Sequence, residues 1–306
     1  PSASGAKNDR QLKTIDSKFS PLIAAVNSIL DDQTDFARSK CCKTFLRPIH
    51  LPSDLIALIY GFLLAKPLKL AYDRVVTFAT TIIKRERFME QAAQLEAIKR
   101  YTIQKLGSDS TGHGLDHIMR VVRMTKKLIE TEAANEFIAV AAAYLHDTID
   151  EKLVISVKEA EEELEDFLRR IDLTNEQIQA IMDIISNMSF ADTLGDARPT
   201  LSREGQIVQD ADWLDGLGSI GITRAVYYGG SHGERIYDPL IKPREHMNRE
   251  EYRTERDETV INHFYEKLLK IKDMLNTETA RKIAAHRQQI MEDFLNEFFL
   301  EWDAKV

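Results

Sequence analysis

The chain has 306 residues, is 43% hydrophobic and 29% charged, and carries a formal net charge of −8. This composition excludes a largely disordered chain and supplies enough apolar residues for one large domain or a domain with an extension. Two adjacent cysteines, Cys41 and Cys42, exclude a disulfide framework and favour a reducing compartment. The longest apolar run, residues 55–65, is shorter than the roughly 20 residues that cross a bilayer. We therefore expect a soluble, cytoplasmic protein without a membrane partner.

The charge is unevenly distributed along the chain. Residues 1–90 carry +5 (14 Lys and Arg, 9 Asp and Glu), and residues 91–306 carry −13 (27 against 40). We predict two parts: a small basic helical module of unknown role, residues 1–90, and a larger acidic domain, residues 91–306. Such an asymmetry bears on partners rather than on fold. For the basic module it leaves open nucleic-acid binding, docking on the acidic domain, and assembly of a homo-oligomer.

Almost every segment has the pattern of a helix, because Leu, Ile, Ala, Glu, Lys and Arg dominate and only 13 Gly and 8 Pro interrupt them. No series of alternating strands joined by hairpin turns is present in the sequence. We therefore predict an all-α protein. The expected helices, in chain order, cover about 11–30, 53–65, 70–105, 116–132, 135–150, 159–170, 174 onwards with a TNEQ capping box, 203–225, 248–272 and 277–303.

Two features of the second half stand out from this helical pattern. Residues 229–246 form the longest expected irregular segment, and long loops in compact domains are often functional. The last expected helix carries a stripe of bulky aromatic side chains, Phe294, Phe298, Phe299 and Trp302. Such a stripe is typical of a core surface or a docking face.

Three segments combine histidine and aspartate in the pattern of a split metal site. GHGLDHIMRV contains His113 and His117, AAAYLHDTIDEK contains the pair His146–Asp147, and QDADWLDGLGSIG contains Asp212 between two other aspartates. Imidazole and carboxylate are common ligands of divalent ions. Ionisable groups inside apolar segments are costly unless they are paired or bound to metal. Each segment alone also fits a hydrogen-bonded core residue, so the hypothesis depends on the three together.

Taken together, the segments resemble the H…HD…D signature of the HD-domain metal-dependent phosphohydrolases, and in particular a subgroup of stand-alone bacterial HD hydrolases. The resemblance rests on GHGxDHxxRV, AAxLHDxxDxK, IISNMSF, QDADxLDxxGxIGIxR and an aromatic, acidic C-terminal helix, and it covers about residues 92–306. It implies an HD-domain helical bundle with a mono- or dinuclear site whose ligands are His117, His146, Asp147 and Asp212. The chain departs from the pattern at Trp213, where a basic residue is common, which leaves the local substrate contacts open.

The resemblance also implies an activity, the hydrolysis of phosphate esters or anhydrides with a divalent metal ion such as Mn, Mg, Fe, Ni or Co. We expect a nucleoside di- or triphosphate as substrate. An alarmone, a cyclic dinucleotide or a phosphomonoester is the alternative, the first because HDxxDE resembles the HDxxED run of alarmone hydrolases. An alternative of another class is a regulatory or nucleic-acid-binding protein in which residues 1–90 act and the HD part senses nucleotide.

Further site residues follow from their distance to the expected ligands. Asp150 and Glu151 come shortly after the HD pair and are predicted to activate the attacking water, with a solvated helix end as the alternative. Arg120 and Lys152 are the predicted phosphate-binding residues, with a structural or surface ion pair as the alternative.

The remaining candidates lie in or near segments that we expect to be loops. His113 lies in the glycine-flanked loop before the first expected ligand and is placed at the mouth of the site, where it could hold substrate. Tyr227, Tyr228 and His232, near the long irregular segment, are candidates to contact the base or sugar. Ordinary packing of the tyrosines and an exposed loop position for His232 are the alternatives.

Overall fold

The computed structural model describes residues 89–107, 114–151, 153–194, 199–244 and 259–306, nearly all of them in the compact unit Glu90–Val306. Over these ranges the backbone forms helices joined by turns, with one isolated bridge between Arg235 and Thr259. The prediction of an all-α protein is therefore confirmed. The cysteines, the apolar run 55–65 and the basic module lie outside the described residues. The predicted division into residues 1–90 and 91–306 stays a prediction.

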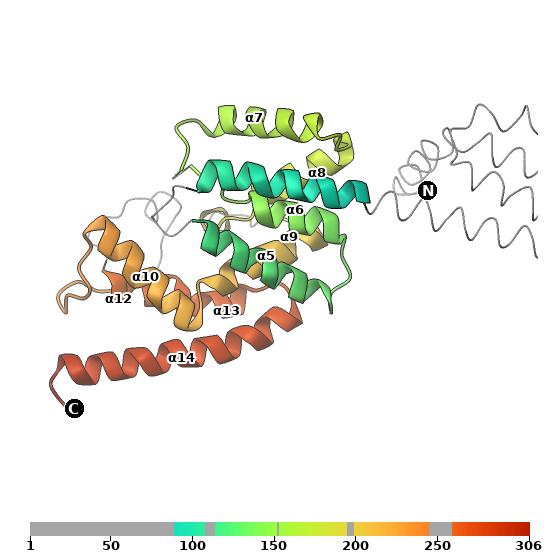
Figure 1. Cartoon of the computed structure of the whole chain (residues 1–306). Coiled ribbons are helices and arrows are strands. Elements are labelled where there is room, and N and C mark those ends of the chain that lie inside the picture. Colours follow the sequence, from blue (N-terminus) through green and yellow to red (C-terminus); the bar gives the residue numbers. More distant parts are fainter. Residues whose placement is uncertain (1–88, 108–113, 152, 195–198, 245–258) are drawn as a thin grey trace, which may run out of the picture. The chain divides into compact units, whose positions relative to one another are not determined.

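A helix over residues 89–106 opens the described part of the chain. The elements that follow are α5 (Leu115–Ile129), α6 (Glu136–Leu145), α7 (Val157–Arg170), α8 (Asn175–Ile185), η2 (Ala191–Thr193), α9 (Arg203–Asp215), α10 (Gly218–His232), α12 (Val260–Glu266), η3 (Leu268–Lys270), α13 (Ile271–Met274) and α14 (Glu278–Trp302). In Figure 1, α14 runs along one side of the bundle beside α10 and α13, and α7 lies on the opposite side. Among the described helices, none is long and apolar enough to serve as a membrane span.

Polar side chains fix where several helices begin. Thr174 precedes α8 and forms the predicted capping box with Gln177, each side chain bonding the other's backbone N–H. Asn135 caps α6 and Ser156 caps α7, in each case by accepting a hydrogen bond from the backbone N–H three residues on. These caps satisfy N–H groups that have no partner inside the helix.

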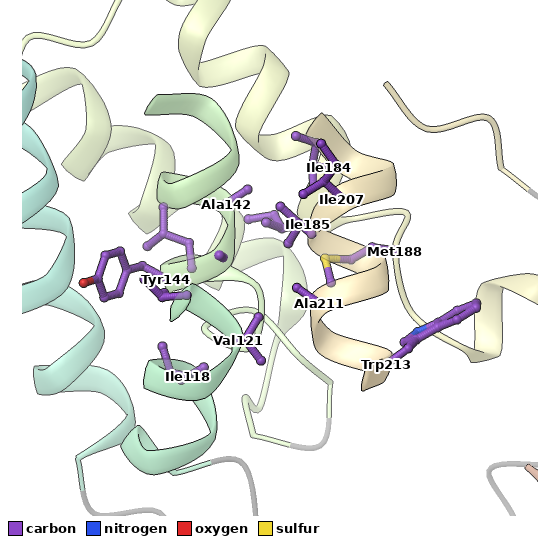
Figure 2. Close-up of a cluster of buried hydrophobic side chains, with 14 of the residues drawn as sticks. Ile118, Val121, Ala142, Tyr144, Ile184, Ile185, Met188, Ile207, Ala211 and Trp213 are labelled. Atoms are coloured by element: carbon purple, nitrogen blue, oxygen red, sulfur yellow. The ribbon is translucent and has the colours of Figure 1, made fainter. Parts of the chain in front are cut away.

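The core lies where α5, α6 and α9 meet. α6 packs on both of the others and on α8, and its residues Phe137–Leu145 are all buried. Figure 2 shows side chains of the three helices converging there, among them Val121 of α5, Ala142 of α6 and Ala211 of α9. Each buried Leu, Ile or Val stabilises the fold by roughly 1.5–3 kcal/mol relative to an exposed position. A helix that is apolar on all sides must be central, so the residues that directly follow α6 also lie in the interior.

The predicted helix 203–225 and the predicted loop 229–246 are both wrong at their boundaries. The helix is broken between α9 and α10, where Gly218 has φ 71°, a conformation that L side chains rarely adopt. The following helix continues to His232 despite Gly229 and Gly230. A Cβ at Gly229 would come within 2.4 Å of Cγ2 of Val260, so this glycine is required by close packing and does not end the helix.

The predicted helix 248–272 is also wrong in its described part. Residues 260–274 form α12, η3 and α13 in succession, because Lys267, with φ −132° and ψ −62°, interrupts the helical backbone. The aromatic stripe of α14 packs within the chain. The ring of Tyr237 lies 5.0–6.0 Å, between centroids, from the rings of Phe298, Phe299 and Trp302, so the stripe holds the segment that follows α10.

Candidate metal centre

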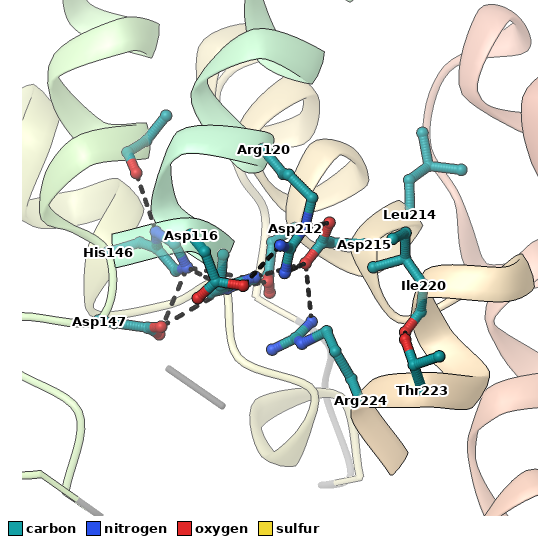
Figure 3. Close-up of polar contacts among 12 residues, drawn as sticks. Asp116, Arg120, His146, Asp147, Asp212, Leu214, Asp215, Ile220, Thr223 and Arg224 are labelled. Atoms are coloured by element: carbon teal, nitrogen blue, oxygen red, sulfur yellow. Dashed lines mark hydrogen bonds and ion pairs between the residues drawn. The ribbon is translucent and has the colours of Figure 1, made fainter. Parts of the chain in front are cut away.

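Three packed helices bring the four predicted ligands together. His117 lies in the first turn of α5, Asp212 lies on α9, and His146 and Asp147 directly follow the buried helix α6. α6 ends at Leu145, one residue before the HD pair. Both the backbone N–H and the hydroxyl of Thr148 donate to the Leu145 carbonyl, which tightens the chain into a turn. Figure 3 shows three of the four, His146, Asp147 and Asp212, gathered in one place.

The donor atoms of this cluster are close to one another. Nε2 of His117 lies 3.3 Å from Nε2 of His146 and 3.5 Å from Oδ2 of Asp147, and Nε2 of His146 lies 3.3 Å from Oδ1 of Asp147. Oδ1 of Asp212 lies 3.3 Å from Nε2 of His117 and 3.7 Å from Nε2 of His146. His117, His146 and Asp147 could hold a metal ion, since one ligand atom of each lies within 4.8 Å of the others.

These distances fit a divalent ion. Metal–ligand bonds of about 2.0–2.2 Å place neighbouring ligand atoms roughly 3.0–3.5 Å apart in tetrahedral or octahedral geometry. The separations of 3.3–3.7 Å within the cluster are close to that range. The donor set of two imidazoles and two carboxylates suits ions of the Zn, Fe, Ni or Mn type.

The outward nitrogen of each imidazole is hydrogen-bonded, which orients the ring. Nδ1 of His117 donates to Oδ2 of Asp215 at 2.7 Å, and Nδ1 of His146 donates to the carbonyl of Ala143 at 3.0 Å. Because the partner of each Nδ1 is an acceptor, the proton of the neutral ring resides there and the Nε2 lone pair faces the cluster.

The carboxylates make the centre attractive to a cation. Burial alone would lower the pKa of His117, but hydrogen bonds with Asp212 and Asp215 outweigh it and raise that pKa to about 9. Burial would raise the pKa of Asp215, yet its hydrogen bonds with His117 and Arg120 hold it well below its usual range. Asp212 is 25% exposed and His117 is 1% exposed. The cluster therefore opens toward solvent on the side of Asp212.

Arg120 makes contacts that favour a structural ion pair over phosphate binding. Its Nε donates to Oδ1 of Asp215 at 2.7 Å and its Nη2 to Oδ2 at 3.0 Å, while Nη1 donates to Asp116 at 2.6 Å. Three of the five guanidinium N–H bonds are thus directed at two carboxylates. These contacts support the alternative interpretation of Arg120, a structural ion pair.

The two predicted water-activating acids lie in the turn that follows the HD pair. Asp150 is half-buried, and its backbone N–H donates to the carbonyl of Asp147 at 3.3 Å, whereas Glu151 is exposed. Their roles stay predictions. His113 and Lys152 lie outside the described residues, so their predicted substrate-binding roles stay predictions.

Tyr228 and His232 both lie on α10, so His232 ends a helix and does not lie in the expected loop. Their rings stack with centroids 4.0 Å apart, and Nδ1 of His232 donates to the carbonyl of Tyr228 at 2.9 Å. Tyr227 is 56% exposed on the same helix. Trp213, at the position where a basic residue is common in the family, is buried and packs edge-on against Phe190. Its side chain therefore belongs to the core.

Two residues of the centre were not predicted from the sequence, Asp215 and Arg224. Asp215 follows Asp212 by three residues, which places both carboxylates on one face of α9. That spacing was a usable signal. Nη1 of Arg224 lies 3.1 Å from Oδ2 of Asp215. Both residues are fixed positions of the QDADxLDxxGxIGIxR pattern, but the pattern does not indicate their contact, which depends on the bend at Gly218.

Asp210, the third aspartate of the segment, has a different task. Its carboxylate accepts hydrogen bonds from the backbone N–H groups of Asn276 and Thr277, at 2.8 and 2.7 Å, where α14 begins. It therefore anchors α14 to α9 and leaves the metal centre to the other two aspartates.

Several known proteins are similar to this chain in sequence and in fold. The sequence profile of the HD domain family matches residues 114–217. YpgQ of Bacillus subtilis is 34% identical over 209 residues, which make up 68% of this chain and 94% of YpgQ. That protein has been solved in complex with ADP, with 31% identity, a TM-score of 0.53 and coverage of 67% of this chain and 95% of the other.

Two further crystal structures extend this likeness. A protein of Lactobacillus plantarum superposes with a TM-score of 0.65 at 48% identity and covers 69% of this chain and 98% of its own. An HD-superfamily hydrolase of Bacillus thuringiensis superposes with a TM-score of 0.55 at 37% identity, over 70% of this chain and 99% of its own. The span matched by the family profile contains His117, His146, Asp147 and Asp212.

Proposed function

This chain belongs to the HD-domain superfamily of metal-dependent phosphohydrolases, and we propose that it hydrolyses a phosphoanhydride bond of a nucleoside di- or triphosphate. The observation that carries the proposal is the cluster of His117, His146, Asp147 and Asp212, whose donor atoms are spaced as metal ligands are. The nucleotide is supported by the likeness to YpgQ, which was solved with ADP.

These four side chains are the proposed ligands of a divalent cation. When bound, the cation supplies Lewis-acid polarisation of a phosphoryl oxygen and lowers the pKa of a water molecule. The protein's own part is to hold the donors in place. Asp215 and the Ala143 carbonyl fix the two imidazole rings, so the ligands need no rearrangement to bind.

Hydrolysis then requires an attacking water and a proton acceptor. The water oxygen bonds to phosphorus and the anhydride P–O bond breaks. Attack at the α phosphorus expels phosphate or pyrophosphate with the electron pair, whereas attack at the terminal phosphorus expels the shortened nucleotide. We assign the proton of the water to Asp150 or Glu151. The turn holds Asp150 beside a proposed ligand, since its N–H bonds the carbonyl of Asp147. A carboxylate so placed can act as a general base.

The acidic charge of residues 91–306, −13 in total, would repel an anionic substrate at long range. At short range the balance differs, because Arg120 and Arg224 both contact the carboxylate of Asp215. Together with a divalent cation on the ligands, they offset the carboxylates of the centre. Beyond a Debye length, about 8 Å at physiological ionic strength, the long-range repulsion is screened, and at the centre itself the carboxylates no longer dominate the local charge.

The test is a metal and substrate screen of the full chain. The protein is loaded separately with Mn, Mg, Ni, Co and Fe and incubated with nucleoside di- and triphosphates, an alarmone, a cyclic dinucleotide and a phosphomonoester. We expect metal-dependent release of phosphate or pyrophosphate, abolished in His146→Ala and Asp147→Ala. Asp166→Asn, an exposed carboxylate of α7, is the control and keeps full activity. The proposal fails if no metal supports hydrolysis of any nucleotide.

Product identification separates the alternatives. Pyrophosphate with a nucleoside monophosphate indicates cleavage between the α and β phosphates, whereas inorganic phosphate indicates cleavage at the terminal bond. If only the alarmone, the cyclic dinucleotide or the phosphomonoester is hydrolysed, the assigned substrate is wrong but the assigned reaction, metal-dependent phosphate hydrolysis, is retained. Nucleic-acid binding by residues 1–90 is a separate prediction, checked by salt-dependent binding of the full chain to DNA or RNA.

A further inference from the structure

We propose that the nucleotide lies along one face of α10, with its phosphate chain at Arg224 and its nucleoside against the stacked rings of Tyr228 and His232. This inference rests on the proposed function, because it names subsites of the same centre. It also orients the substrate, with the phosphates nearest to the metal ligands and the nucleoside farther along α10.

The three residues share a face of α10 and follow one another away from the metal centre. Arg224, Tyr228 and His232 are each four residues apart, and residues at this spacing are neighbours on a helix, about 6 Å apart along the axis. Nη1 of Arg224 lies 3.1 Å from Oδ2 of Asp215, the same oxygen that accepts the hydrogen bond from His117. The face therefore begins beside a proposed metal ligand, and Figure 3 shows Arg224 extending from α10 to that point.

Arg120 and Arg224 reach the same carboxylate, Asp215, from two different helices. Arg120 contacts both oxygens of Asp215 and also the carboxylate of Asp116. This two-bond contact orients Asp215, but the single charge of Arg120 is shared between two carboxylates. Arg224 supplies the second positive charge, so a phosphate that approaches the centre meets a guanidinium there and not an uncompensated carboxylate. A planar guanidinium also matches the geometry of phosphate oxygens.

Tyr228 and His232 form an aromatic platform one to two turns further along. Their rings are 4.0 Å apart with an interplanar angle of 24°, and the hydrogen bond from Nδ1 of His232 to the Tyr228 carbonyl fixes the histidine ring. Aromatic rings stack on the face of any base and so contribute affinity without strong base selectivity. We therefore expect several nucleotides to bind with similar affinity.

The experiment compares two non-hydrolysable ligands that differ only by the nucleoside, methylenediphosphonate and α,β-methylene-ADP. Each is titrated calorimetrically into the manganese-loaded full chain, and the metal content is measured before and after. Arg224→Gln is expected to weaken both ligands about tenfold or more while retaining manganese. Tyr228→Ala is expected to weaken α,β-methylene-ADP about tenfold and to leave methylenediphosphonate unchanged. Arg224→Lys, which keeps the charge, is expected to fall between the wild type and Arg224→Gln.

Val226→Ala is the control, because Val226 is an exposed residue of the same helix and lies about 200° around the helix axis from Tyr228. It should leave both affinities unchanged. The proposal is overturned if the wild type binds neither ligand, if Arg224→Gln binds both as the wild type does or loses the metal, or if Tyr228→Ala weakens both ligands equally. If the wild type shows the expected binding pattern but hydrolyses no nucleotide, the proposed function fails and the subsites stand.

Discussion

Nδ1 of His117 donates a 2.7 Å hydrogen bond to the buried carboxylate of Asp215. This bond joins a helix at the start of the described HD region to one nearly a hundred residues later. It sets the tautomer and the orientation of a proposed metal ligand, and it connects that ligand through Arg120 to the exposed carboxylate of Asp116. The proposed ligand His117 is therefore oriented by a chain of charged side chains that are not themselves among the four proposed ligands.

Removal of the charge on Asp215 should weaken metal binding without unfolding the protein. Asp215→Asn keeps the shape of the side chain but loses the negative charge that orients His117. We expect the affinity for manganese to fall about 10–100-fold, measured by competition with a metal-binding dye. Asp166→Asn serves as the exposed control. An unchanged affinity would show that Asp215 has no part in holding the centre.

Metal binding should release protons near neutral pH. Burial would lower the pKa of His117, but hydrogen bonds with Asp212 and Asp215 raise it to about 9 in the metal-free protein. The ring is therefore protonated at pH 7, and a ligand must lose that proton to bind metal. Because the protonated form predominates below this pKa, the apparent metal affinity should rise with pH toward 9 and level off above it. Calorimetry in buffers of different ionisation enthalpy measures the release, and its absence at pH 7 would contradict the prediction.

Asp210 should affect stability but not metal binding. In the wild type, the two carboxylate oxygens of Asp210 accept hydrogen bonds from the backbone N–H groups of Asn276 and Thr277. The amide of Asp210→Asn has only one acceptor oxygen, so one of these N–H groups loses its partner. We expect a loss of about 1–3 kcal/mol in the free energy of unfolding, read as a lower thermal midpoint, with metal content unchanged. Asp183→Asn, an exposed residue of α8, should leave the midpoint in place. Loss of metal in Asp210→Asn would contradict this prediction, because it would mean that the substitution displaces α9 together with the proposed ligand Asp212.

The bend between α9 and α10 provides a fourth prediction. Gly218 has φ 71°, and a Cβ there would lie 3.1 Å from Cβ of Arg287. We expect Gly218→Ala to destabilise the protein by about 1–2 kcal/mol. Gly230 lies inside α10, and a Cβ added there would have no atom within 4 Å. Gly230→Ala should therefore stabilise the protein by about 0.5–1 kcal/mol. Thermal melts that show the same sign for both variants would contradict this account.

Much of the fold and the ligand set could be predicted from the sequence. Helix capping and amphipathic spacing act within a dozen residues, which is why the capping box at Thr174 is confirmed. The ligand-bearing segments carry recognisable motifs, and the structure brings His117 and His146 within 3.3 Å. Helix boundaries in glycine-containing segments were predicted less well. Gly229 is retained inside a helix only because Val260, from α12, lies against it.

What the sequence determined by itself is therefore the helical class, the family and the chemistry of the ligands, since these depend on residue types and local spacing. The tertiary structure decided which charges support those ligands. Asp215, Arg120 and Arg224 meet only after α5, α9 and α10 have packed. An ion pair between distant residues depends on helix packing and on one bend at Gly218, and neither leaves a periodic signal in the chain.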